Sequence, residues 1–446
     1  MSIRTLLCTT ALLCLAHPVA LQAQPPPGDA AKPPEIAPHK RSLAIPIALG
    51  PPKAQPAPTV ECLVTLGPTV PICALAFSPD GKTLAQGGYQ EVLLWDLANG
   101  KLAKRIGAGQ VTGFVRRLAF HKDGRLLAVA EGTPHGPGAV RGYDVESGQQ
   151  TLNFPEPKDV VYALAFSPDG KLLAAGGADA LVHVWSIEEK KLVTTIKEHG
   201  DWVLGLAFSA DGKFLATASA DRSARVFEVE GWKPAIRMPE TDTVNGAAFS
   251  PDGQLLASAV GGPAERAIRI RRKDNAQQAR LIDTGRALPL DIIWAPPVTK
   301  PAPKGAPPPP QGGGIYVAGS DKTVKVFSGA NGNLVATLSG HGDWVYAVAL
   351  SADGTKLASG SGDGTVKLWS AVDNKPLATL VQLSPRTDEW LAITAQGYHA
   401  TSSAGALQWK TANLTIPPEK ITSLLQNAEM VQKAIAGEQS APPVLQ

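Results

Sequence analysis

The sequence predicts an all-β protein, organised as a single β-propeller of four-stranded antiparallel blades. A motif of an apolar segment followed by an Asp-Gly turn recurs six times, with its glycines at Gly81, Gly124, Gly170, Gly212, Gly253 and Gly354. Successive glycines lie 41 to 46 residues apart, except for a last interval of 101 residues, about twice as long. Many glycines (44) and prolines (39) with few aromatic residues (6%) favour short strands joined by tight turns.

The N-terminus is typical of an export signal peptide. Arg4 precedes an apolar run from Leu6 to Ala16, and Ala23 supplies a small residue before a cleavage site. The run is short for a stable transmembrane helix, although retention as an uncleaved anchor stays open. We expect residues 1–23 to be an export signal. The mature protein is then expected in the periplasm, the cell envelope or the extracellular space, with no stable membrane span.

Two segments are rich in proline. Residues 24–58, which open QPPPGDAAKPPEIAPHK, predict a disordered linker because such a composition cannot bury a core. The tract PAPKGAPPPPQGGG (301–314) predicts a loop insertion near residues 296–314 of the folded part, with a docking site for a proline-binding partner as the alternative. Cys62 and Cys73 could pair in an oxidising compartment, but two buried thiols on different strands are favoured.

Each repeat predicts four strands. The Asp-Gly turn suits a hairpin because glycine accepts a positive φ. In the last full repeat the strand before the turn is followed by LASGSG (357–362) and by VKLWS (366–370), which carries an aromatic residue. A weaker fourth strand, such as LVATL (334–338), completes the unit. Four antiparallel strands in about 42 residues correspond to one propeller blade.

The segment GHGDWVYAVALSADGTKLASGSGDGTVKLWS (340–370) resembles the WD-repeat family, and the resemblance extends over about residues 60 to 380. It implies a buried hydrogen-bonded ladder of His, Ser or Thr, Asp and Trp in each blade. By motif position the ladder residues are His341, Ser359, Asp363 and Trp369, then His199, Thr217 and Asp221, and finally Asp179 and Trp185. Phe227 replaces the Trp of the second set, and the third set has no His.

The number of blades is predicted as eight, with seven as the alternative. We expect EWLAITAQGYHATSSAGALQW (389–409) to contain three strands of a last blade, whose fourth strand is VECLVTLG (60–67). Within a propeller expected at residues 59–411, the 350 residues from Glu61 to Lys410, less about 18 for the insertion, give about 41 residues for each of eight blades, close to the observed spacing. The 389–409 segment also resembles one that follows WD repeats in some bacterial proteins, so the expected type is a secreted bacterial one.

A helix is predicted after the propeller, within the tail formed by residues 412–446. Pro418 suits a first helical turn, Gly437 suits a C-terminal cap, and apolar residues fall mostly on one face. We favour packing of this helix on the propeller over a free partner-binding helix.

The sequence contains no motif for catalysis, metal binding or a cofactor. It lacks a haem-attachment Cys-x-x-Cys-His, a His-Glu-x-x-His and a phosphate-binding loop, so no catalytic residue, metal or cofactor is expected and the protein is predicted not to be an enzyme. A net charge of +3 gives no reason to expect nucleic-acid binding. One basic cluster is interpreted as a solvated blade edge rather than a polyanion site: Arg266, Arg269, Arg271, Arg272 and Lys273.

The best functional signal lies just before the innermost strands. In WD-repeat proteins this position faces the end of the propeller that binds partners. The residues assigned there to a partner-binding face are Phe114, Val160, Trp202, Leu288 and Trp344. Exposed aromatic residues of this kind resemble interface anchors, although packing against adjacent loops is equally compatible.

These observations lead to two functional hypotheses. The first is a non-catalytic protein-binding scaffold of the periplasm or cell envelope, a monomer within a complex whose partner is another envelope or secreted protein or peptide. The alternative is an enzyme or small-ligand binder that uses the central channel.

Overall fold

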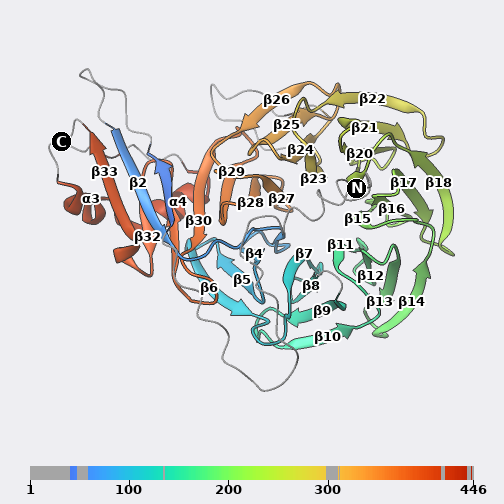
Figure 1. Ribbon diagram of the computed structural model, residues 1–446, viewed down its shortest axis with the longest axis horizontal. Coiled ribbons are helices and arrows are strands. Elements are labelled where there is room, and N and C mark those ends of the chain that lie inside the picture. The colour runs from blue at the N-terminus through green and yellow to red at the C-terminus, as the bar shows by residue number, and fades with distance from the viewer. Residues whose placement is uncertain are drawn as a thin grey trace, which may run out of the picture.

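The computed structural model describes residues 41–47, 59–133, 136–297, 310, 312–412, 417–438 and 443. Their strands form eight antiparallel sheets. Seven sheets surround a central axis and the eighth lies beside them (Figure 1). The prediction of an all-β propeller followed by a short helical segment is confirmed. The expected signal at residues 1–23 lies outside the described residues.

Six blades are four-stranded sheets whose strands run in chain order from the axis to the outer edge. In order, they comprise β3 (Leu75–Phe77), β4 (Thr83–Gly87), β5 (Val92–Asp96) and β6 (Lys101–Ile106); β7 (Phe114–Phe120), β8 (Leu126–Gly132), β9 (Gly138–Asp144) and β10 (Gln150–Phe154); β11 (Val161–Phe166), β12 (Leu172–Gly177), β13 (Val182–Ser186) and β14 (Lys191–Ile196); β15 (Val203–Phe208), β16 (Phe214–Ser219), β17 (Ser223–Glu228) and β18 (Lys233–Pro239); β19 (Val244–Phe249), β20 (Leu255–Gly261), β21 (Arg266–Arg272) and β22 (Gln278–Asp283); and β23 (Pro289–Trp294), β24 (Gly314–Gly319), β25 (Val324–Ser328) and β26 (Leu334–Leu338).

The seventh blade is larger, and the eighth sheet combines both ends of the chain. The seventh comprises β27 (Val345–Leu350), β28 (Lys356–Ser361), β29 (Thr365–Ser370), β30 (Pro376–Gln382), β31 (Trp390–Ile393) and β32 (His399–Thr401). The eighth contains β1 (Arg41–Pro46), β2 (Thr59–Leu66) and β33 (Leu407–Ala412), and the short 3₁₀ helix η1 (Ala404–Ala406) precedes β33.

The repeated turn is held by its own side chains. In the first blade, Asp80 Oδ1 accepts two hydrogen bonds. One comes from Ser78 Oγ at 2.6 Å and the other from the backbone N–H of Lys82 at 3.0 Å. Gly81 has φ +67°, a left-handed conformation that other residues adopt with strain. Ser, Asp and Gly at this spacing therefore specify the hairpin between the first two strands of a blade.

The ring closes between the seventh and first blades, because β27 contacts β3 directly. Ile72, just before β3, packs against Gly360 so closely that a Cβ on Gly360 would lie 2.6 Å from an Ile72 methyl group. No room is left there for a further blade. Eight sheets are thus present, as predicted, but seven of them form the ring and the eighth does not face the axis.

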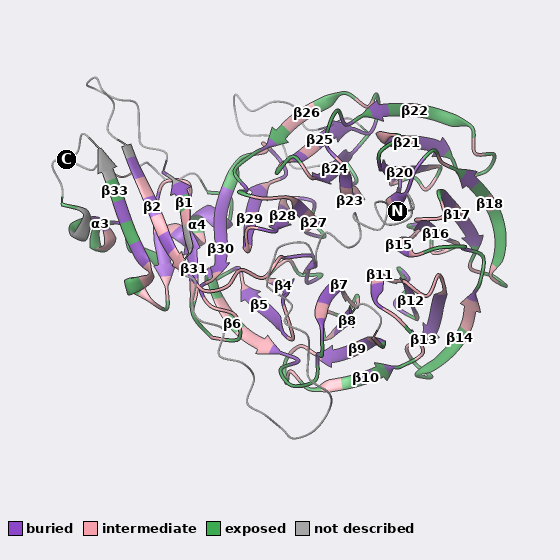
Figure 2. Cartoon of the chain, viewed as in Figure 1, coloured by how far each residue is buried: buried purple, intermediate pink, exposed green. Residues whose placement is uncertain are grey.

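The three predicted strands of the last unit exist, in a different arrangement. The predicted pairing of the N-terminal strand is confirmed, since β2 pairs with β33 and places Cys62 opposite Trp409. The Trp390 strand, expected beside the channel, instead extends the seventh blade outward, where β31 pairs with β30. As a result β30 is mostly buried, whereas the outer strands β14, β18 and β22 are mostly exposed (Figure 2).

The prediction of a disordered linker over residues 24–58 is wrong for residues 41–46. They form β1, which pairs with β2 and places Ile45 opposite Cys62. Ile45 and Ile47 are buried in a cluster with Val60 and Leu425. The reason is an alternation of Leu43, Ile45 and Ile47 that suits a half-buried strand. The remaining linker residues, 24–40 and 48–58, lie outside the described part of the chain.

The tail contains two helices, α3 (Pro418–Leu425) and α4 (Ala428–Ile435), where one was expected. Asn427 separates them, because its side chain accepts a hydrogen bond from the N–H of Met430 and caps α4. Both helices pack on the strands, as predicted: α3 contacts β33, and α4 contacts β30 and β32. Among the described helices none is long and apolar enough to cross a membrane.

The proline-rich insertion joins β23 to β24, in place of the Asp-Gly turn of the sixth blade. Residues 298–309 and 311 lie outside the described range. Cys62 and Cys73 are buried thiols, the state that the sequence favoured. Burial raises the pKa of the Cys62 thiol to about 12.

Candidate functional site

The candidate site is the end of the propeller at which the inner strands begin. Phe114 is the first residue of β7, and Trp202 and Trp344 immediately precede β15 and β27. In the two Asp-Trp pairs the aspartate fixes the strand entry: Asp201 and Asp343 each accept from the backbone N–H of the following tryptophan at 2.8 Å. The repeated sequence thus places equivalent side chains around one mouth of the channel.

Four of the five predicted contact residues are partly exposed at this mouth: Phe114, Trp202, Leu288 and Trp344. Val160 is completely buried, with an exposed fraction of 0%. It packs against Gly132, where an added Cβ would lie 2.7 Å from the Val160 Cα. Its assignment to a partner-binding face is therefore wrong, because an adjacent blade covers it.

Aromatic and cation–π contacts link four blades at the mouth. Tyr89 and Phe114 have ring centroids 4.8 Å apart, and the Arg116 guanidinium lies 5.1 Å from the Phe114 centroid and 6.0 Å from that of Tyr162. Tyr162 stacks on Trp202, with centroids 5.6 Å apart and planes inclined by 29°. We call this set the aromatic arc: Tyr89, Phe114, Arg116, Tyr162 and Trp202. The four rings of the arc are partly exposed, whereas Arg116 is buried between them, so the surface that the arc offers is made by the rings.

A second aromatic contact lies on the seventh blade, where the rings of Trp344 and Tyr346 are 6.4 Å apart. Sequence reasoning missed Arg116, Tyr162 and Tyr346. Each follows a predicted mouth position by two residues and is the extra residue of a β-bulge, such as the one between Val161 and Ala163. A bulge re-aims its extra side chain, and the two-residue spacing was the available signal.

Behind the mouth, the seventh blade contains a complete polar ladder. The Asp363 carboxylate accepts from His341 Nδ1 at 3.1 Å, and both His341 Nε2 and Trp369 Nε1 contact Ser359 Oγ, at 2.8 and 2.9 Å. Burial alone would raise the pKa of Asp363, but the hydrogen bonds from His341, Thr365 and Gly342 lower it to about 2. The ladder joins two strands, β28 and β29, to the turn between them and to the loop before the blade, so it holds the loop that carries Trp344.

The fourth blade has the shorter form that its sequence implies. His199 contacts Asp221 at 2.8 Å and Thr217 at 2.6 Å, and Phe227 is buried without a polar group to offer. Burial opposes the ionisation of Asp221, but the hydrogen bonds from His199, Ser223 and Gly200, together with the attraction of His199, outweigh it and lower the pKa of the carboxyl.

In two other blades the tryptophan donates to a residue other than a ladder serine. In the third blade, Trp185 Nε1 donates to Glu156 at 3.1 Å rather than to a ladder serine, and Asp179 contacts His183 at 3.4 Å. The structure therefore does not join Asp179 and Trp185 in one ladder. In the first blade, Trp95 Nε1 donates to Gln86 at 2.8 Å.

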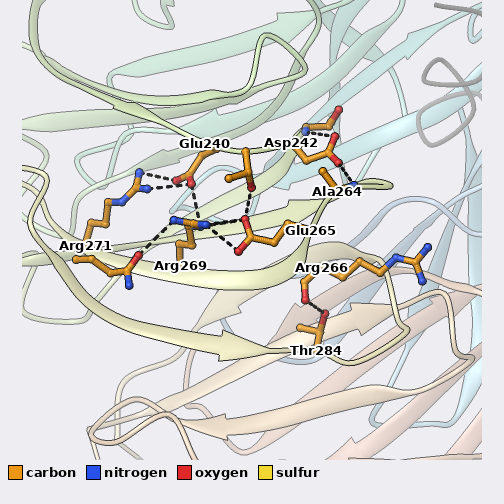
Figure 3. A network of polar contacts seen from close by, with 11 residues as sticks. Glu240, Asp242, Ala264, Glu265, Arg266, Arg269, Arg271 and Thr284 are labelled. Carbon is orange, nitrogen blue, oxygen red and sulfur yellow. Dashed lines mark hydrogen bonds and ion pairs between the residues drawn. The ribbon is translucent and has the colours of Figure 1, made fainter. Parts of the chain in front are cut away.

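The fifth blade replaces the ladder by charges (Figure 3). Arg271 stands at the tryptophan position and Glu240 at the histidine position, and their side chains pair through two hydrogen bonds of 2.7 and 3.1 Å. Arg269 pairs with Glu265 at 2.8 Å and lies 3.4 Å from Glu240. Burial raises the pKa of Glu240 to about 7, against the attraction of both arginines. The interpretation of this cluster as a solvated edge is wrong for Arg271, which is only 8% exposed.

Within the described residues no three His, Cys, Asp or Glu side chains gather as a metal site. Two histidines outside the ladders pack structurally: His399 is completely buried near Trp409, and His121 Nε2 contacts the carbonyl of Gly170 at 3.0 Å. What the mouth presents is therefore contact area and stacking surface.

Comparison with known proteins agrees with this geometry. The family model described as "WD domain, G-beta repeat" matches residues 60–96, 148–186, 190–228, 234–270 and 332–370. The chain contains WD repeats. Each match covers the three inner strands of one blade, namely the first, third, fourth, fifth or seventh, and begins on the strand that precedes that blade in the chain: β2, β10, β14, β18 or β26.

Three relatives show the extent of the likeness. The chain is 33% identical over 120 residues to WD repeat-containing protein SL1-17 of Schistosoma mansoni, which is 27% of this chain and 38% of that protein. It is 33% identical over 123 residues to small ribosomal subunit protein RACK1y of Oryza sativa, 26% of this chain and 34% of that protein. With WD repeat-containing protein 1 of Bos taurus the identity is 32% over 117 residues, 26% and 19% of the two chains. The matches thus span well under half of each relative.

Proposed function

We propose that this WD-repeat protein is a non-catalytic scaffold that binds another protein through the mouth of the propeller. The observation that carries the proposal is the aromatic arc, five side chains in contact that are contributed by four consecutive blades. Tyrosine, tryptophan and arginine are the residue types most enriched among energetically dominant interface contacts. An arc in which such residues support one another is already ordered before binding, so little conformational entropy is lost on association.

The second contact area is Trp344 with Tyr346 on the seventh blade, beside Leu288 of the sixth blade. A peptide or loop lying across the mouth would contact both areas at once. The aromatic arc and the Trp344 area would then hold opposite ends of the partner segment.

We further propose an exported location and a secreted bacterial type, with an envelope or secreted protein as the partner. This part rests on the sequence of residues 1–23, with Arg4, an apolar run and Ala23. Fractionation of cells that express the tagged full-length chain tests it, and recovery in the cytoplasmic fraction would contradict it.

The binding face is tested by affinity purification from an envelope extract. The wild type is compared with Trp202→Ala/Trp344→Ala, and with Leu192→Ala/Leu334→Ala as a control that removes two apolar side chains from outer strands, where they are 42% and 55% exposed. We expect the first variant to lose the partner that the wild type and the control retain. Identical partners for all three, with unchanged thermal unfolding, would refute the assignment of the face.

A further inference from the structure

The axial channel encloses a cavity of about 600 Å³ between the inner strands. Its wall includes aliphatic side chains, among them Leu164, Leu206, Ile292 and Val348, together with aromatic and polar residues such as Phe208 and Ser250. Alanine occupies the equivalent wall position of four blades, which keeps the centre open: Ala76, Ala207, Ala248 and Ala349. This volume falls in the range of about 300 to 1,000 Å³ that small-molecule sites occupy.

The cavity extends away from the aromatic arc. Ala210 and Pro251, which help to line it, belong to the Asp-Gly turns that follow the inner strands, whereas Phe114 and Trp202 stand at the start of those strands. The cavity is therefore a separate feature, at the other end of the channel from the proposed protein-binding face.

One ion pair crosses the channel, and both of its residues line the cavity. Arg117 comes from β7 and Asp291 from β23, on opposite sides of the axis (Figure 1). Nη1 and Nη2 of Arg117 donate to Oδ2 and Oδ1 of Asp291 at 2.9 and 2.7 Å. The corresponding positions of the other blades hold small residues, which gives the arginine room to reach across: Ala74, Ala163, Gly205, Gly246 and Ala347.

Asp291 and Arg117 differ in how many of their hydrogen-bonding groups have a partner in this ion pair. Each Asp291 oxygen accepts two hydrogen bonds, since Oδ1 also receives the N–H of Ile292 and Oδ2 the N–H of Val348, both at 3.0 Å. A guanidinium has five N–H donors, of which the bonds to Asp291 use two. The Arg117 side chain is 26% exposed and that of Asp291 only 4%. The Arg117 guanidinium therefore presents hydrogen-bond donors to the cavity, whereas the Asp291 carboxylate is buried.

A guanidinium that lines a cavity together with aliphatic side chains offers a site for an elongated apolar molecule with an accepting head. We propose that the channel cavity binds an aliphatic carboxylate of medium chain length, whose head accepts from the Arg117 guanidinium and whose tail lies along the alanine and leucine wall. Asp291 holds the guanidinium in place through a fixed bidentate contact, so the head group meets a preorganised donor. A carboxylate gains charge-assisted hydrogen bonds that an alcohol of the same length does not.

The test measures binding of decanoate and of decan-1-ol to the full chain by isothermal titration calorimetry. We expect one decanoate per chain and an affinity for decanol weaker by about tenfold or more. Arg117→Met/Asp291→Asn removes both charges together, so no buried charge is left alone. This variant is expected to bind decanoate no better than decanol, with its affinity for decanol unchanged.

Two further variants test whether decanoate binds in the channel cavity. Ala207→Leu adds bulk to the wall and is expected to weaken both ligands, whereas Trp202→Ala/Trp344→Ala at the opposite mouth is expected to bind decanoate as the wild type does. The proposal fails if the wild type binds no decanoate, or if it binds both ligands equally. It also fails if Arg117→Met/Asp291→Asn or Ala207→Leu retains full affinity for decanoate, or if the mouth variant loses it. These outcomes leave the protein-binding face untouched, because that is tested separately.

Discussion

The Glu91 carboxylate of the first blade accepts a hydrogen bond of 3.1 Å from the side-chain amide of Gln382, at the end of the fourth strand of the seventh blade. The same oxygen accepts from the backbone N–H of Arg386 at 2.8 Å, and the other pairs with Arg105 at 3.0 Å. A single buried carboxylate thus connects the two blades at which the ring closes.

Replacement of Glu91 by alanine is expected to reduce the free energy of unfolding by about 3 kcal/mol, because three donors lose a buried acceptor and Arg105 loses a buried charge partner. The matched control is Asp388→Ala, since Asp388 pairs with the same arginine at 2.6 Å but its side chain is 83% exposed. We expect the control to change stability by less than about 1 kcal/mol. Urea unfolding measures both, and equal losses would contradict the role of Glu91 in closure.

Ser359→Ala is expected to destabilise the protein by about 2 kcal/mol. The substitution removes the group that both His341 Nε2 and Trp369 Nε1 contact, and it leaves a buried indole N–H unsatisfied. The comparison variant is Ala175→Ser at the equivalent position of the third blade. There we expect no gain in stability, because Trp185 already donates to Glu156. A gain at residue 175 as large as the loss at residue 359 would show that the ladder serine acts independently of its tryptophan.

Glu240 is expected to make stability depend on pH between about 4.5 and 7. Its pKa is about 7 in the folded state and 4.5 as the reference for the unfolded chain. In this window the folded state retains a proton that the unfolded state has lost, so the contribution of Glu240 to stability is complete below pH 4.5 and decreases as pH rises through 7. The full change is about 3 kcal/mol.

Glu240→Gln should remove this contribution. The comparison between variant and wild type is essential, because burial lowers the pKa of His341 and of His399, and these groups stabilise the fold increasingly as pH rises through the same range. Thermal unfolding from pH 5 to pH 8 measures the difference between the two proteins. A difference that stays constant with pH would show that Arg271 and Arg269 keep Glu240 ionised throughout.

Ile435→Ala in α4 is expected to lower the free energy of unfolding by about 3 kcal/mol, the cost typical of a cavity left by a buried isoleucine. Ile435 is 1% exposed and packs in one cluster with Leu97 of the first blade. Leu424→Ala removes an apolar helix side chain that is 54% exposed, and we expect it to change stability by less than about 1 kcal/mol. Equal effects would mean that α4 does not stabilise the closure of the ring.

The repeat and its turn chemistry could be predicted from sequence because both are local. Ser78, Asp80 and Gly81 determine their hairpin within four residues, and the same pattern recurs at nearly constant spacing. The pairing of β2 with β33 was also accessible, since VECLVTLG has the character of a fourth strand and no blade of its own. The ladder of the seventh blade followed from motif positions for the same reason.

The direction of the last unit could not be predicted from spacing. Seven residues, 383–389, join β30 to β31, as many as the seven residues 107–113 that join β6 to β7, yet only the second connection returns to the axis. The difference lies at the ring closure, where Ile72 packs against Gly360 and leaves no room for a further inner strand. One sequence signal was available: PLATLVQ (376–382) is more apolar than the outer strands of the other blades.

Long-range pairs were inaccessible for a different reason. Arg117 and Asp291 are 174 residues apart, and each looks like an ordinary polar residue in its own repeat. Glu240 and Arg271 replace two ladder positions together, so neither change is interpretable without the other. The arc residues Arg116 and Tyr162 depend on bulges that strand alternation does not predict.

The pairing of β2 with β33 has a mechanical consequence. The first two described strands, β1 and β2, and the last one, β33, form a single small sheet. This sheet lies beside the ring rather than within a blade. Tension applied at the N-terminal end is therefore resisted first by the hydrogen bonds of β1 to β2 and of β2 to β33. The seven blades, with their mouth and their channel, carry no load until that sheet opens.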